Sequence, residues 1–128
     1  MQSVQQTSDG GYILAGGVYG PMPGFAFLVK TDSDGQLVWQ NAYPTYLIGL
    51  AVTETADGYV FAGRTSDIPG KPYQPVLVKT DGSGTFEWEK VFSFSNGLAR
   101  DVKPVSGGFV VACSAPTSGV LVKTDASG

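Results

Sequence analysis

The pentapeptide Leu-Val-Lys-Thr-Asp occurs three times in this chain of 128 residues, at residues 28–32, 77–81 and 121–125. A second block precedes each copy, and its sequences are SVQQTSDGGYILAG at 3–16, AVTETADGYVFAG at 51–63 and, more degenerate, DVKPVSGGFVVAC at 101–113. The copies return roughly every 45 residues, a period typical of repeated supersecondary units. We therefore expect the chain to place three similar units side by side.

Each complete copy divides into four short strands separated by turn signals. An Asp-Gly pair, a strong hairpin signal, follows the first strand, and a second Asp-containing turn precedes the fourth. The expected strands are 3–7, 12–16, 25–31 and 37–43 in the first copy, 50–55, 59–64, 76–80 and 85–92 in the second, and 100–105, 109–114 and 120–124 in the third. The third copy has no fourth strand.

Hydrophobic patterning separates the inner strands from the outer one. The second and third strands of a copy are near-continuous apolar runs, as expected for strands covered on both faces. The fourth strand alternates instead, with Leu37 and Trp39 expected on one side and Val38 and Gln40 on the other, which indicates a half-exposed outer strand. The composition agrees, because 18 Gly and 8 Pro beside 42% hydrophobic residues favour short strands and tight turns over long helices.

Four short antiparallel strands per repeat at this period are typical of β-propeller blades. We therefore predict an all-β fold of three blades in one domain, 1–128, with blades at about 1–46, 47–95 and 96–128, the third without its fourth strand. The SVQQTSDGGYILAG…LVKTDSDGxxxW pattern resembles the propeller repeats common in multi-repeat proteins of bacteria and archaea. The resemblance implies the propeller fold and a secreted or cell-surface origin, and it implies no particular activity.

Three blades form an arc and not a ring, because propellers use about four to eight blades around a central channel. The first and third blades would each expose an apolar face that normally meets a neighbour, and large apolar patches rarely stay exposed on a monomer. We expect self-association to cover them, most simply as a homodimer that closes a six-bladed ring. A larger ring, or a piece of a longer propeller, would also satisfy this constraint.

Composition argues against several classes of function. A net charge of −3 with eight Lys and Arg disfavours a nucleic-acid partner, which needs clustered cations. The chain contains no His and a single Cys, Cys113, and we predict no catalytic residue, no cofactor and no metal site. No apolar run approaches the roughly 20 residues of a membrane span, and the N-terminus does not resemble a signal peptide, so we expect a soluble chain without a membrane partner.

Side chains that recur at equivalent positions are predicted to serve the scaffold. The aspartates in the turns are expected to cap backbone amides, the tryptophans to anchor neighbouring sheets, and the lysines to end strands with their head groups in solvent. These residues are Asp9, Asp57, Asp32, Asp81 and Asp125, Trp39 and Trp88, and Lys30, Lys79 and Lys123. Cys113 replaces a glycine of the other copies and is expected to be a small buried residue.

Residues that do not recur are the candidates for ligand binding, because the scaffold does not require them. The loops between the second and third strands differ in every copy and should share one rim of the ring, where Tyr19 and Tyr73 could stack on a sugar or a peptide. Arg64 and Arg100 are the two arginines, and Arg100 at the start of an innermost strand could face the channel or pair with Asp101.

These observations favour a non-catalytic propeller module for binding or assembly, with a protein or a glycan as a possible ligand. A carbohydrate-binding, lectin-like propeller that uses the loop rim would also fit the sequence. So would a fragment of a larger propeller hydrolase or lyase, or an engineered fragment without a ligand. The absence of His and of an unrepeated acidic pair argues against an enzyme.

Overall fold

A computed structural model describes residues 1–18, 24–43, 47–65 and 69–128, and these residues form antiparallel strands and no helix. Sheet 1 contains β1 (Ser3–Gln6), β2 (Tyr12–Val18), β3 (Phe25–Thr31) and β4 (Leu37–Ala42). Sheet 2 contains β5 (Leu47–Thr55), β6 (Gly58–Thr65), β7 (Pro75–Asp81) and β8 (Phe86–Val91). Sheet 3 contains β9 (Leu98–Val105), β10 (Gly108–Ala115) and β11 (Ser118–Asp125). The all-β prediction and the numbers of strands, four, four and three, are confirmed.

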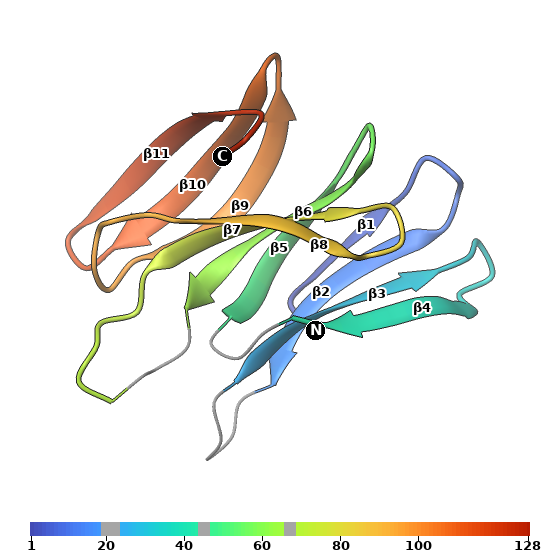
Figure 1. Cartoon of the computed structure of the whole chain (residues 1–128), viewed down its shortest axis with the longest axis horizontal. Helices are drawn as coiled ribbons and strands as arrows, with labels where there is room; N and C mark the ends of the chain where they lie inside the picture. The colour runs from blue at the N-terminus through green and yellow to red at the C-terminus, as the bar shows by residue number, and fades with distance from the viewer. Residues whose placement is uncertain (19–23, 44–46, 66–68) are drawn as a thin grey trace.

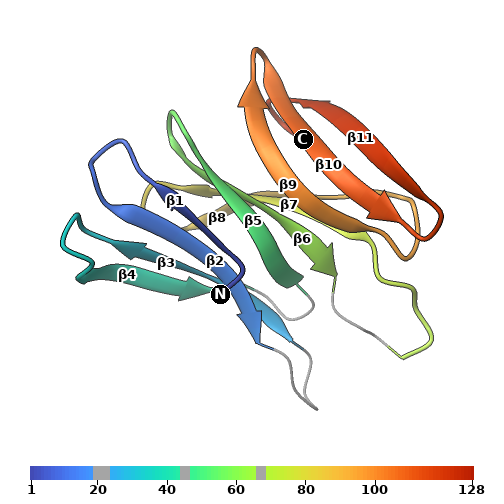
Figure 2. The ribbon, with the colours of Figure 1, turned by 180° about the vertical axis from the view of Figure 1, so that it is seen from behind.

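The three sheets lie one after another in chain order, with sheet 2 between the other two (Figures 1 and 2). Within each sheet the strands pair in sequence order, so that β1, β5 and β9 form one edge and β4, β8 and β11 form the other. We call the face of a sheet that points toward the preceding sheet its rear face, and the face toward the following sheet its front face. Sheet 1 therefore has an open rear face, and sheet 3 has an open front face.

Aspartates hold the turns that follow β3, β7 and β11. Asp81 Oδ1 accepts hydrogen bonds from the backbone amides of Ser83 at 2.9 Å and Thr85 at 2.8 Å. Asp32 and Asp125 each accept the equivalent bond from the amide two residues further on, at 2.9 Å. A carboxylate that accepts amides of its own turn stabilises that turn over extended chain. The prediction that these three aspartates are turn residues is confirmed.

The inner strands of sheet 2 are buried on both faces. On β6, Tyr59 and Phe61 pack toward sheet 1, whereas the alternate residues Val60 and Ala62 pack toward sheet 3. Sheets 1 and 3 bury only the side that faces sheet 2, and the residues of β11 alternate between intermediate and exposed. The predicted burial of both strand faces is therefore confirmed for sheet 2 and is wrong for sheets 1 and 3, because each of these has one covered face.

The prediction that Leu37 and Trp39 share a face is wrong. The register between β3 and β4 shifts between Lys30 and Thr31, so that Trp39 lies opposite Lys30 while Leu37 lies opposite Thr31. Neighbouring residues of a strand point to opposite faces, and the bulge therefore separates Leu37 from Trp39. Leu37 is exposed, and Trp39 packs against the core.

Each tryptophan lies on a glycine of the next sheet, which confirms the predicted role as a packing anchor. The ring of Trp39 contacts Gly84, where a methyl group would lie 2.7 Å from Cζ3, and it packs 5.8 Å from the Tyr59 ring. Trp88 repeats this arrangement with Gly128, where the corresponding distance is 2.8 Å. Glycine is required for two reasons, since its φ is +80° at Gly84 and the indole leaves no room for a side chain.

The matched glycines of sheets 1 and 2 provide a test of this packing. Gly35 and Gly84 have the same φ of +80°, but a methyl group at Gly35 would meet no atom within 4 Å. Gly35→Ala and Gly84→Ala should therefore share the backbone strain of about 1 kcal/mol, and Gly84→Ala should lose roughly 1–3 kcal/mol more through overpacking. We expect Gly84→Ala to lower the melting temperature by roughly 4–12 °C more than Gly35→Ala, measured by circular dichroism. Equal losses would show that the contact with Trp39 contributes nothing.

Candidate interaction surfaces

The front face of sheet 3 exposes a leucine that the other two sheets bury. Leu28 and Leu77 occupy the same position of the repeat on the front faces of sheets 1 and 2, and both are 0% exposed. Leu121 on β11 is 73% exposed, and Ala112 beside it on β10 is also exposed. The front face of sheet 3 therefore presents the residue types of a sheet-to-sheet contact without a sheet against them.

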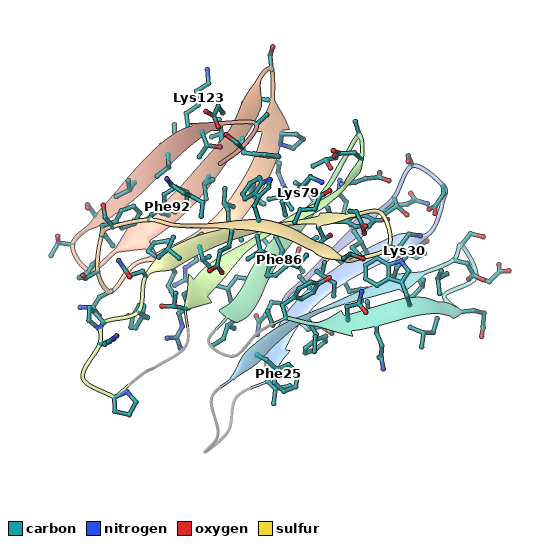
Figure 3. The ribbon with its side chains drawn as sticks, in the orientation of Figure 1. Phe25, Lys30, Lys79, Phe86, Phe92 and Lys123 are labelled. Atoms are coloured by element: carbon teal, nitrogen blue, oxygen red, sulfur yellow. The ribbon has the colours of Figure 1, made fainter. Side chains whose placement is uncertain are left out.

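The rear face of sheet 1 is the second open surface. Val4 on β1, Val18 on β2 and Phe25 on β3 are exposed. Farther out lies a hollow of about 300 Å³ lined by Phe25, Phe27, Gln40, Asn41 and Ala42. Phe25 is the first residue of β3 and is labelled in Figure 3. An apolar surface of this kind is typical of an interaction site.

The prediction that the repeated lysines reach solvent is wrong for Lys30 and Lys79, which are 4% and 5% exposed. Each lies opposite the tryptophan of its own fourth strand, Lys30 opposite Trp39 and Lys79 opposite Trp88. Lys123 is exposed as predicted, because no fourth strand covers it among the described residues. Figure 3 labels the three lysines, one on each sheet.

The buried lysine of sheet 1 is paired with the aspartate of the β1–β2 turn. Lys30 Nζ lies 2.9 Å from Asp9 Oδ2 and donates to the carbonyl oxygen of Thr31 at 2.7 Å. Hydrogen bonds from Thr7 and from Lys30 hold the pKa of the Asp9 carboxyl well below its usual value. The pair meets the requirement that a buried ammonium group has partners for its protons.

The buried lysine of sheet 2 has two carboxylate partners. Lys79 Nζ lies 3.1 Å from Asp57 Oδ1 and 2.9 Å from Glu87 Oε2, and it donates to the carbonyl oxygen of Thr80 at 2.8 Å. Burial alone would lower the pKa of Lys79, but the hydrogen bonds to Glu87 and Asp57 outweigh it and raise that pKa. The same lysine lowers the pKa of Asp57. Asp9 and Asp57 thus each form an ion pair that connects the third strand of their sheet to the turn between its first two strands. The sequence did not predict this role.

Of the four predicted ligand residues, the structure brings two together. The guanidinium carbon of Arg64 lies 4.6 Å from the centroid of the Tyr73 ring, a cation–π contact that covers one face of that ring. Arg100 lies on β9, where its Nε donates to Ser114 Oγ at 3.3 Å, and Asp101 pairs with Lys103 at 3.0 Å. Tyr19 lies outside the described residues.

The described part of the chain was searched for metal sites and for a reactive cysteine. No group of three or more His, Cys, Asp or Glu side chains within residues 1–18, 24–43, 47–65 and 69–128 is placed to hold a metal ion. Cys113 is buried, as predicted, and burial raises the pKa of its thiol, which disfavours the reactive thiolate. No helix among these residues is long and apolar enough to cross a membrane.

Comparison of the sequence with protein-family models and with curated proteins found no match. The resemblance to propeller repeats is therefore a prediction that rests on the repeated sequence blocks, and the two open faces are the features of the described structure that point to a function.

The lysine–aspartate pairs should make the fold sensitive to acid. Because the folded-state pKa values of Asp9 and Asp57 are lowered, their contribution to the free energy of unfolding is complete above about pH 4 and disappears as the pH falls through those lowered values. We expect the variant with Asp9→Asn and Asp57→Asn to lose less stability than the wild type between pH 5 and pH 2, measured from urea midpoints. Asp101→Asn is the control, because Asp101 and Lys103 form an exposed pair of little energetic weight.

A wild type that loses no more stability than the double variant between pH 5 and pH 2 would contradict this assignment.

The stability of the fold at alkaline pH provides a second check, on Lys79. Its pKa is raised in the folded state, so its contribution is complete below its usual pKa of 10.5 and disappears as the pH rises through the folded value.

Proposed function

We propose that this chain is a non-catalytic β-propeller assembly module whose two open sheet faces bind each other between copies. The front face of sheet 3 in one copy would pack against the rear face of sheet 1 in the next. Two copies would form two such contacts and close a six-bladed ring, within the blade numbers that propellers use. A closed dimer forms two contacts for a single loss of translational freedom, which favours it over an open chain of copies.

The observation that carries this proposal is the exposure of Leu121. The equivalent Leu28 and Leu77 are 0% exposed where sheet 1 meets sheet 2 and sheet 2 meets sheet 3. A leucine buried in two equivalent contacts and 73% exposed in the third position is expected to lie in a third contact of the same kind.

The rear face of sheet 1 supports the same interpretation. Tyr12 and Leu14 on β2 occupy the register positions that Tyr59 and Phe61 occupy on β6, opposite Thr31 and Val29 of β3. On sheet 2 these positions form the contact with sheet 1. The rear face of sheet 1 can thus receive a sheet as the rear face of sheet 2 does. The cation–π contact over Tyr73 gives no comparable support to sugar binding.

The test is the mass of the chain in solution, measured by light scattering coupled to size exclusion over a dilution series. We expect twice the chain mass of 13.4 kDa for the wild type and a single chain for Leu121→Asp, which places a charge in the apolar contact. Phe86→Asp is the control. Phe86 is also an exposed apolar residue, at 45%, but it belongs to sheet 2 and lies on neither of the two open faces.

A wild-type chain that stays a monomer at every concentration would refute the ring. A dimer that Leu121→Asp leaves intact would show that the chain associates through another surface.

A further inference from the structure

The outer strands β4 and β8 complete the contacts between sheets through alternate side chains. On β4, Trp39 covers Gly84, the Asn41 amide donates to the Gly84 carbonyl oxygen at 3.1 Å, and the hydroxyl of Tyr43, just beyond the strand, donates to the same oxygen at 2.7 Å. The Tyr43 ring also packs 5.1 Å from Phe61. Trp88 on β8 and Phe92, just beyond that strand, occupy the corresponding positions against sheet 3. A tryptophan followed four residues later by an aromatic side chain is therefore the element that joins one sheet to the next.

Sheet 1 has the receiving half of this contact without an occupant. Gly35 has the same φ of +80° as Gly84 and the same Asp-held turn, and a methyl group placed on it would meet nothing within 4 Å. Tyr12 occupies the register position of Tyr59, the residue against which Trp39 packs. The rear face of sheet 1 thus has the glycine and the aromatic ring that hold an indole in sheet 2.

Sheet 3 lacks the other half of this contact, the outer strand with its tryptophan, because among the described residues no strand pairs with the outer edge of β11. An unpaired strand edge presents backbone groups to which an extended peptide can add. Lys123 on that edge strand is exposed and has no ion pair within the described residues, whereas Lys79 on β7 is paired with Glu87 of β8 at 2.9 Å. The missing element on sheet 3 is therefore an extended strand with a carboxylate beside its tryptophan.

We propose that the β11 edge of one copy and the rear face of sheet 1 of the next copy together bind an extended segment of a partner chain that carries Glu-Trp with an aromatic residue four positions after the Trp. The segment adds to β11, its glutamate pairs with Lys123, and its indole lies on Gly35 and Tyr12 of the neighbouring copy. This inference rests on the proposed ring, since the two halves of the site meet only there.

A second copy of this chain does not supply the occupant. Trp39 and Trp88 are already packed within their own copy, against Gly84 and Gly128. A ring made of two such copies therefore leaves the indole position on Gly35 open at each contact between copies. The occupant that we propose is therefore a partner segment with the chemistry of β8, and the two sites of a ring predict two peptides per dimer.

The probe is a labelled synthetic peptide with the sequence of residues 85–93, Thr-Phe-Glu-Trp-Glu-Lys-Val-Phe-Ser. Fluorescence anisotropy measures its affinity for the full chain, and light scattering on the same samples reports the mass. We expect binding at one peptide per chain, weakened roughly 30-fold when the peptide tryptophan is replaced by alanine, as for a buried aromatic anchor. Two further peptides carry N-methyl groups on alternate sets of amides, and strand addition predicts that one set abolishes binding while the other does not.

Protein variants assign the two halves of the site. Gly35→Asn tolerates a positive φ and fills the indole position, so it should weaken binding roughly 30-fold. Gly107→Asn is the matched control, because Gly107 has a φ of +79° and open space around it in the β9–β10 turn. Replacing the glutamate that directly precedes the peptide tryptophan by glutamine should weaken binding roughly tenfold in the wild type and leave it unchanged in Lys123→Met.

The outcomes separate this inference from the ring itself. A dimer that does not bind the peptide, or that binds the alanine peptide equally well, overturns the inference and leaves the ring standing. Equal binding by Gly35→Asn and Gly107→Asn also overturns it. A chain that is a monomer with and without the peptide refutes the ring and the composite site together.

Discussion

The contact of an indole with a bare glycine is the constraint on which the arrangement of the sheets depends. Trp39 can approach sheet 2 because Gly84 has no side chain, and Gly84 has its left-handed conformation because Asp81 holds the turn around it. A close approach of this kind sets the spacing between sheets, since protein interiors do not tolerate gaps or overlaps of a methyl group. The same combination of a glycine in an aspartate-held turn and an indole from the preceding sheet occurs at both contacts, with Trp39 on Gly84 and Trp88 on Gly128.

Burial of a lysine behind the tryptophan follows from the same geometry. The indole of the fourth strand lies over the position of Lys30 or Lys79, and the ammonium group then needs partners inside the sheet. Asp9 and Asp57 supply them from the first turn, and Glu87 adds a second carboxylate in sheet 2. Removing one member would leave a charge buried without compensation, which is costlier than the absence of the whole pair. The ion pair and the aromatic contact therefore depend on each other.

Most of the fold could be predicted from the repeats in the sequence. A strand that is apolar on every residue is expected to be an inner strand, and the repeated turns mark where strands end. The sequence did not reveal the bulge between Lys30 and Thr31, which moves Leu37 away from Trp39, since the alternation of polar and apolar residues reads the same with or without it. It also placed Lys30 in solvent, because lysine is rarely buried and a partner such as Asp9, far away along the chain, leaves no local signal. Of the residues chosen for not recurring, Arg64 on β6 and Tyr73 in the following loop contact each other, a proximity that no spacing rule predicts.

The third repeat departs from the other two mainly on the side that faces away from sheet 2. Phe109 and Val111 on its rear face keep the aromatic and apolar character that packs against sheet 2. On its front face the aspartate that would pair with the lysine is missing from the β9–β10 turn, and Lys123 is left exposed. A surface that keeps Leu121 but lacks its own carboxylate is suited to an apolar neighbour that brings an acidic group. In the proposed ring, the contact between copies would therefore differ chemically from the two contacts within a copy, and this difference would let the ring recognise a partner that its internal contacts do not need.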